Sequence, residues 1–217
     1  RDTGKRGWAC ARVSEGCRNC YAATLNRRVG TGLDFTVPDL DLVKWQVNER
    51  EYAAWRKLKP IPVSDDGFTL SNRTRPPRVF VCDMTDLFLA PLSMVDRTVE
   101  AIRATPNITA IVLTKRPSDA ATHFLWLKGF SAIRPYHPPA NLQLGISAED
   151  QKALNFRWEW LGWPDYAVRI ISYEPMLGPI IIPSDCSWLI AGGESGLGFR
   201  EMNMDWMQSA AEQCTQL

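Results

Sequence analysis

Five short β-branched runs, each ending in a polar cluster and followed by a helical pattern, constrain this fold more than any other feature. The runs are RVFVCDMTD, ITAIVLTKRP, LQLGISAED, VRIISYEP and SWLIAGGESG. Apolar residues at helical spacing occupy Ser93 to Ala104, Ser118 to Lys128, Asp150 to Leu161 and Asn203 to Gln216. Because the runs do not alternate, we expect parallel strands covered on both faces. The pattern predicts an α/β fold, a barrel or partial (β/α) barrel, with a doubly wound open sheet as the alternative.

The segment from Asp34 to Pro77 departs from this alternation. A helical stretch around Val47 to Leu58 is followed by KPIPVSDDGFTLSNRTRPP, a composition typical of an exposed excursion. With 217 residues and 45% hydrophobic content, the chain is long enough for one well-buried core. We therefore predict a single domain over residues 1–217 with an inserted excursion at about 34–77.

The charge balance argues against a global electrostatic partner. Lys and Arg total 25 against 24 Asp and Glu, so any nucleic-acid binding has to use a local patch. No apolar run approaches the ~20 residues that cross a bilayer, and the first residues, RDTGKRGW, lack the apolar core of a signal peptide. We expect no membrane association and a cytoplasmic location.

Three of the six cysteines, Cys10, Cys17 and Cys20, lie in the stretch ACARVSEGCRNCYA with the spacing C-x6-C-x2-C. Zinc sites and iron–sulfur sites both use the C-x2-C half of this pattern. No fourth cysteine or histidine is nearby, so a closed zinc site needs a remote ligand. On a four-iron cluster, three thiolates instead leave one iron open to a co-substrate. A predicted helix over Tyr21 to Val29 follows the loop.

The other three cysteines, Cys82, Cys186 and Cys214, are scattered and lie in or beside apolar stretches. We predict that they are small buried apolar residues rather than ligands.

Polar residues follow every predicted strand. In a parallel barrel the loops after the strands form the active face, so a cluster at each position is typical of a site assembled from many loops. The clusters are Asp83 and Asp86, Lys115 and Arg116, Ser147 and Glu149, Ser172 and Glu174, and Gly192, Gly193, Glu194 and Ser195. Singly, each also has an ordinary interpretation as a helix cap, a solvated corner or a turn.

In order along the chain, the cysteine pattern, DMTDLF, LTKRP, LGISAED, SYEPMLGP, IAGGESG and a later MDW resemble a phage-associated, radical-SAM-like family of largely uncharacterised proteins. The resemblance runs from about Trp8 to Cys214. It implies a partial (β/α) barrel with a [4Fe–4S] cluster on Cys10, Cys17 and Cys20, and S-adenosylmethionine on the open iron.

The resemblance also implies roles at the strand ends. Gly192, Gly193 and Glu194 are expected to hold the methionine amino group, and Glu149, Glu174 or Ser195 the ribose hydroxyls. Lys115 and Glu174 are the expected catalytic residues, and the other expected cofactor contacts are Tyr21, Ser147 and Ser172. The loop departs from the common radical-SAM pattern, which has three residues in its first gap and an aromatic residue where Asn19 stands.

The implied function is a radical S-adenosylmethionine enzyme that needs an electron donor and resides in the host cytoplasm if phage-encoded. The substrate suggested by the phage resemblance is a nucleotide or a base in DNA, with phosphates met by Arg73, Arg75 and Arg78 or by Arg27 and Arg28. Two alternatives stay open: a zinc-stabilised nucleic-acid-binding module without turnover, and a barrel that keeps its cluster without catalysis. The sequence does not specify the oligomeric state.

Overall fold

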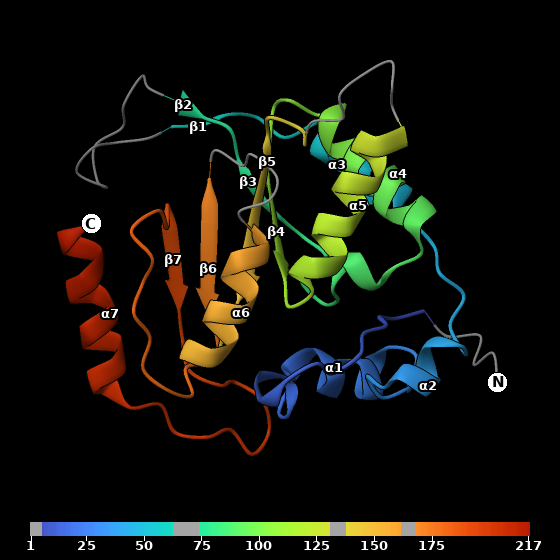
Figure 1. The fold of residues 1–217 in the computed structure, drawn as a ribbon. Coiled ribbons are helices and arrows are strands. Elements are labelled where there is room, and N and C mark those ends of the chain that lie inside the picture. Colours follow the sequence, from blue (N-terminus) through green and yellow to red (C-terminus); the bar gives the residue numbers. More distant parts are fainter. Residues whose placement is uncertain (1–5, 63–73, 131–137, 162–167) are drawn as a thin grey trace.

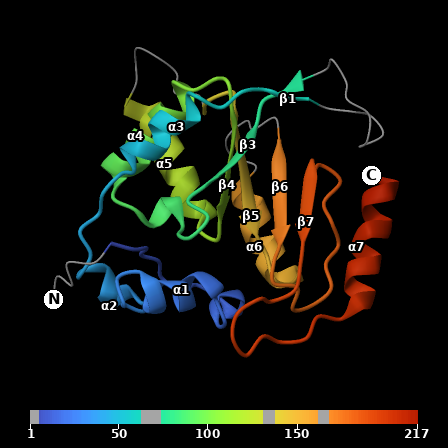
Figure 2. The same ribbon diagram turned by 180° about the vertical axis from the view of Figure 1, so that it is seen from behind.

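Five parallel strands form the central sheet of this computed structural model, which describes residues 6–62, 74–130, 138–161 and 168–217. The strands lie side by side in chain order, and all neighbouring pairs are parallel. They are β3 (Arg78–Val81), β4 (Thr109–Thr114), β5 (Leu142–Ser147), β6 (Arg169–Tyr173) and β7 (Trp188–Ala191). The sheet curls into a half-barrel (Figures 1 and 2). The predicted partial barrel is therefore confirmed, and each strand lies within one of the five β-branched runs.

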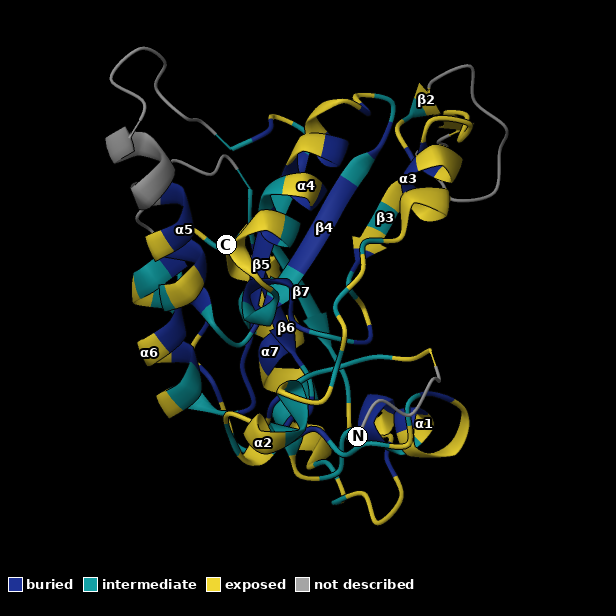
Figure 3. Ribbon diagram, turned by 90° about the vertical axis from the view of Figure 1, so that its right-hand side faces the viewer, coloured by how far each residue is buried: buried dark blue, intermediate teal, exposed yellow. Residues whose placement is uncertain are grey.

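Helices connect β3 to β4, β4 to β5 and β5 to β6, as the apolar spacing predicts, whereas an irregular segment connects β6 to β7. The helices are α4 (Leu92–Arg103), α5 (Pro117–Phe130) and α6 (Gln151–Leu161), and α7 (Met204–Gln216) follows the last strand. The buried residues of β4, β5 and β6 form the main core together with the inner faces of these helices. Figure 3 shows β4 as almost continuously buried, in agreement with its unbroken apolar run. Within the described residues no helix is long and apolar enough to cross a membrane.

The described part of the excursion contains two short helices, α2 (Val37–Leu40) and α3 (Glu49–Trp55), and an antiparallel pair, β1 (Ile61–Pro62) and β2 (Thr74–Arg75). Helix α3 is shorter than the predicted stretch because the Asn48 side chain caps it, accepting a hydrogen bond from the Glu51 amide at 3.3 Å. Tyr52 and Trp55 of α3 are buried in the main core. Residues 63–73 of the predicted excursion lie outside the described residues.

The scattered cysteines behave differently from one another. Cys82 and Cys186 are partly buried and pack against the main core, in line with the prediction. Cys214 is exposed, so its predicted burial is wrong. Its apolar neighbours along the chain do not determine which side of α7 faces the sheet.

Candidate functional site

A cavity of about 480 Å³ lies at the carboxyl ends of the strands, beneath the cysteine loop. We call it the strand-end cavity. Helix α1 (Tyr21–Val29) and α2 lie across this end of the sheet, opposite the β1–β2 pair (Figure 1). All predicted site residues except Glu149 and Gly192 line the cavity: Cys10, Cys17, Cys20, Tyr21, Lys115, Ser147, Ser172, Glu174, Gly193, Glu194 and Ser195. The structure thus brings residues from the first and last parts of the chain to one site.

The cysteine loop is a compact local structure. A single 3₁₀ turn, Glu15–Cys17, closes through a hydrogen bond of 2.9 Å from the Cys17 amide to the Ser14 carbonyl, and Cys20 is the N-cap of α1. Cys10, Cys17 and Cys20 are free thiols of intermediate exposure. The segment that carries Cys10 is joined to the segment after β3, because the Thr85 hydroxyl donates to the carbonyl of Ala9, the residue before Cys10.

The three thiols share the cavity wall without surrounding one point. Among the described residues, no three His, Cys, Asp or Glu side chains are grouped closely enough to hold a single metal ion. In a four-iron cluster each thiolate binds a different iron, so the sulfurs stand farther apart than they do around one zinc ion. The cavity wall holds Cys10, Cys17 and Cys20 and also Cys82, and thiols are the donors that an iron–sulfur cluster and a zinc ion both use, so this donor set is compatible with a cluster.

Burial controls the ionisation of the first cysteine. It raises the pKa of Cys10 to about 11, with further contributions from the Asp86 carboxylate and from the Cys17 thiol. Cys10 is thus a neutral thiol until a cation replaces its proton. Asp86 itself is not a free carboxylate, because it accepts hydrogen bonds from the Thr114 hydroxyl at 2.8 Å and the Lys115 amide at 2.9 Å.

Glu194 is paired with protein groups on both of its oxygens. Its Oε2 accepts from the side-chain amide of Asn19 (Nδ2) at 2.8 Å and from Arg200 Nε at 3.0 Å. Its Oε1 accepts from Arg200 Nη2 at 2.6 Å. The carboxylate that the resemblance assigns to the methionine amino group therefore already contacts a guanidinium. Arg200 was not among the predicted residues, although a buried carboxylate requires a nearby cation.

Glu149 also lies in a buried ion pair and not on the cavity wall. Its Oε2 is 2.7 Å from Arg157 Nη1, and this nitrogen also donates to the Ser147 carbonyl at 2.6 Å. Burial is the largest single effect on the pKa of Glu149 and raises it, but Arg157, together with Ser14 and Lys115, lowers the pKa below its ordinary value. A Cβ atom on Gly16 would come within 3.0 Å of this carboxylate, so the pair supports the cysteine loop from below.

Glu174 differs from these two carboxylates because it faces the cavity without a cation partner among the described residues. The Ser172 hydroxyl donates to its Oε2 at 3.0 Å. A Cβ on Gly192 would lie 2.8 Å from Oε1, which indicates that Gly192 leaves room for this side chain. Tyr21 lies near Glu174, and its pKa is raised by burial and then by Asp83, Cys20 and Glu174.

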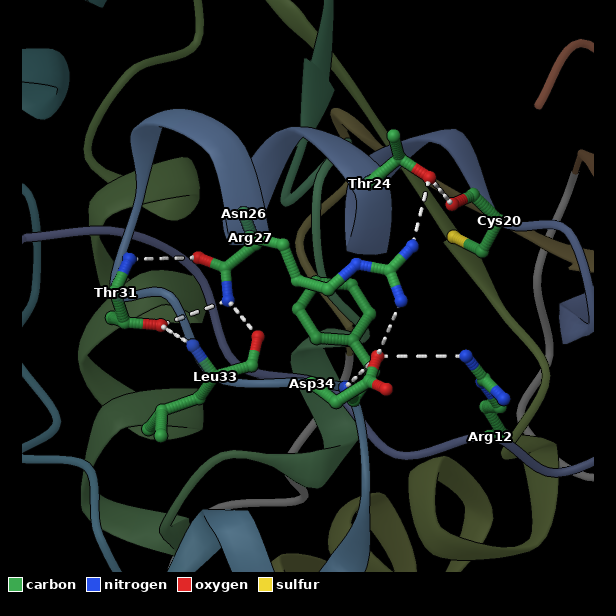
Figure 4. A network of polar contacts seen from close by, with 9 residues as sticks. Arg12, Cys20, Thr24, Asn26, Arg27, Thr31, Leu33 and Asp34 are labelled. Atoms are coloured by element: carbon green, nitrogen blue, oxygen red, sulfur yellow. Dashed lines mark hydrogen bonds and ion pairs between the residues drawn. The ribbon is translucent and has the colours of Figure 1, made fainter. Parts of the chain in front are cut away.

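A polar network fixes α1 behind the cysteine loop (Figure 4). The fully buried Asn26 accepts from the Trp8 amide at 2.9 Å and donates to the Leu33 carbonyl at 2.9 Å. Arg12 and Arg27 both contact Asp34, at 3.5 and 3.6 Å. These contacts connect α1 to the irregular segments before and after it. Arg27 is already paired with a carboxylate.

The arginines predicted to meet phosphates do not form one patch. Arg75 and Arg78 lie at the amino end of the sheet, where the Arg78 guanidinium stacks 4.7 Å from the Trp188 ring. Arg27 and Arg28 lie on α1, across the opposite end (Figure 1). Arg73 is outside the described residues.

A second cavity of about 620 Å³ adjoins the strand-end cavity, and the segment from Val81 to Asp86 lines both cavities. Trp8, Trp45, Tyr52 and Trp55 contribute to its walls. The sequence did not predict this cavity, because three of these four aromatic residues belong to the excursion and they show no periodic pattern.

A family model described as a protein of unknown function (DUF5131) matches residues 4–217 of the chain. No curated protein and no solved structure matches it.

Proposed function

The chain belongs to the DUF5131 family, and we propose that it is a radical S-adenosylmethionine enzyme with a [4Fe–4S] cluster on Cys10, Cys17 and Cys20. One observation supports this most strongly. The three thiols share a single cavity with polar groups from the ends of four neighbouring strands, β3, β4, β5 and β6, and from the loop after β7. Such convergence is typical of a catalytic site in a parallel barrel.

When bound and reduced by an external electron donor, the cluster would supply the one electron that the sulfonium of S-adenosylmethionine accepts as its carbon–sulfur bond breaks. The products would be methionine and a 5′-deoxyadenosyl radical, which would take a hydrogen atom from the substrate. The contribution of the chain is to hold the reactants and keep water away. Three sulfurs would fix the cluster. The part of the cavity wall to which Cys20 and Ser195 contribute would orient the nucleoside.

Glu174 is the carboxylate best suited to accept hydrogen bonds from the ammonium group of S-adenosylmethionine. It lines the cavity and has no described cation partner, whereas Glu194 is bound to Arg200 and Glu149 to Arg157. Ser172 orients it through the 3.0 Å hydrogen bond. Lys115, also on the wall, carries the positive charge suited to the carboxylate of the methionine moiety or to a substrate anion.

For the substrate we propose a nucleotide or a base, entering from the second cavity. The aromatic walls of this cavity suit a flat heterocycle, because bases stack on aromatic rings. Because the second cavity shares a wall with the strand-end cavity, a base bound there would lie next to the nucleoside carbon that carries the radical.

The test is anaerobic purification followed by analysis of iron, sulfide and zinc, and then reduction in the presence of S-adenosylmethionine. We expect about four irons and four sulfides per chain, as a [4Fe–4S] cluster requires, and formation of 5′-deoxyadenosine. The variant Cys17→Ala is expected to lose both, whereas Cys214→Ala, which removes an exposed thiol far along the chain, serves as the matched control. Zinc without sulfide would instead indicate the nucleic-acid-binding alternative, and an intact cluster without 5′-deoxyadenosine would indicate a barrel without catalysis.

A further inference from the structure

The loop that carries Cys17 and Cys20 is held by side chains that follow the last strand of the sheet. We infer that Glu194 and Arg200 position the cysteine loop, acting together with Asn19 as a clasp, and do not bind the co-substrate. This inference deepens the proposed function, and it rests on that function only in its consequence for cluster binding.

The contacts of Asn19 carry the first step. Asn19 lies between Cys17 and Cys20. Its side-chain nitrogen Nδ2 donates to Glu194 Oε2 at 2.8 Å and to the Gly198 carbonyl at 2.9 Å. A displacement of Asn19 would change the positions of both neighbouring cysteines, because Cys20 follows it directly and only Arg18 separates it from Cys17.

Arg200 contacts the other side of the same loop. Its Nη2 donates to the Glu15 carbonyl at 2.9 Å, and its Nη1 lies 3.3 Å from the Glu15 carboxylate. The Glu15 carbonyl also accepts from the Arg18 amide at 3.1 Å, so Arg200 is attached to the backbone of the turn itself. One guanidinium thus bridges Glu194 and the cysteine loop.

The backbone contact at Gly196 shows how closely the two segments approach. A Cβ atom there would lie 1.7 Å from the Asn19 carbonyl oxygen, a separation that no side chain can occupy. The last glycine of GGESG is therefore required by the packing of this segment against the cysteine loop. Both the glycine and the glutamate of the motif contact Asn19.

Electrostatics explains why the pair is a stable attachment. The Glu194 side chain is only 4% exposed, and a carboxylate buried to this extent is unfavourable without a cation. Arg200 provides two parallel N–H donors, the geometry that matches a carboxylate best. A co-substrate ammonium would have to displace this guanidinium before it reached Glu194.

Hydrogen exchange of the metal-free protein tests the clasp independently of any cofactor. The amides of Cys17 and Arg18 are hydrogen-bonded within the loop, at 2.9 and 3.1 Å. We expect Arg200→Ala to speed their exchange by about tenfold or more, since charge-assisted hydrogen bonds are lost. Arg200→Lys keeps the charge without the two parallel donors and is expected to restore part of the protection. Asn19→Ala releases the loop without leaving a charge unpaired, and it covers the case in which Arg200→Ala fails to fold.

The matched control is Arg97→Ala. Arg97 forms the same two-point contact with Glu49, at 2.9 and 2.7 Å, on the exposed surface between α3 and α4. This variant is expected to leave exchange in the cysteine loop unchanged. Unchanged exchange of Cys17 and Arg18 in both Arg200→Ala and Asn19→Ala would overturn the inference.

Cluster affinity supplies the second readout. After anaerobic reconstitution, we expect Arg200→Ala to bind the cluster roughly tenfold more weakly and to show an altered spectrum of the reduced cluster, as for other residues that orient metal ligands. Arg200→Lys is expected to be intermediate. If the wild type assembles no cluster while the variants still exchange faster, the clasp is supported and the proposed function is contradicted. If the variants exchange faster but bind the cluster as the wild type does, the positioning role is overturned.

Discussion

The ionisation state of Glu194 is the residue-scale property on which the clasp depends. Hydrogen bonds from Arg200 and, more weakly, from the Asn19 side chain lower the pKa of Glu194 to about 2 against the opposing effect of burial. Because the pKa in the folded state is below the ordinary value of 4.5, the ionised form stabilises the folded protein. This stabilisation is complete above pH 4.5 and is lost as the pH falls toward 2.

Glu194→Gln removes this dependence. We expect the wild type to exceed the variant in free energy of unfolding by about 2 to 3 kcal/mol at neutral pH. The difference is expected to shrink as the pH falls from 4.5 toward 2. Urea titrations of both metal-free proteins across this range provide the measurement. A difference that stays constant down to the lowest pH would show that the charge of Glu194 does not stabilise the fold.

The partners of the strand-end residues mark the limit of prediction from sequence. The parallel sheet brings the carboxyl ends of its strands to one edge, so the convergence of Lys115, Ser172 and Glu174 followed from the alternation of strands and helices, whereas the place of Cys10, which follows no strand, did not. The partner of Glu194 did not, because Arg200 lies in an irregular segment with no periodicity, and only folding brings it back to Glu15. Strand-end position alone also failed to separate Glu149, which is buried, from Glu174, which faces the cavity.

At the element scale, the cysteine loop rests on two ion pairs supplied by different elements, one partly buried and one fully buried. Arg200 and Glu194 come from the segment after β7, whereas Arg157 comes from α6 and holds Glu149 beneath Gly16. The side chains of Arg157 and Glu149 are 6% and 3% exposed, so removal of either partner leaves an uncompensated charge in the interior.

Replacing the cation of the second pair tests this support. We expect Arg157→Met to lower the free energy of unfolding by about 3 kcal/mol or more, because Glu149 then remains buried without a cation. The control Arg97→Met breaks an exposed pair and is expected to cost at most about 1 kcal/mol. Chemical denaturation of the metal-free variants measures both values. Equal losses in the two variants would contradict a special role for the buried pair.

At the scale of the whole molecule, the described residues form two separate groups of buried apolar side chains. The large group lies between the sheet and its helices. The small one, formed by Ala22, Ala23, Phe35 and Met84, lies under the cysteine segment, and Cys10 and Cys20 pack against it. A core of this size provides little stability of its own. The cysteine segment therefore depends on its polar attachments and, under the proposed function, on the cluster.

Removing the cluster is therefore expected to loosen one part of the molecule and not the other. A ligand that binds only the folded form stabilises the elements that hold it. Compared with the reconstituted protein, we expect the metal-free protein to exchange the amides of α1 about tenfold faster or more. The amides of β4 and β5, which belong to the large core, are expected to exchange at the same rate in both states. Cys17→Ala is expected to show the faster exchange of α1 with or without added iron and sulfide. Similar changes in α1 and in the sheet would mean that the two groups of buried residues unfold as one unit, and unchanged α1 exchange would mean that the segment is held without the cluster.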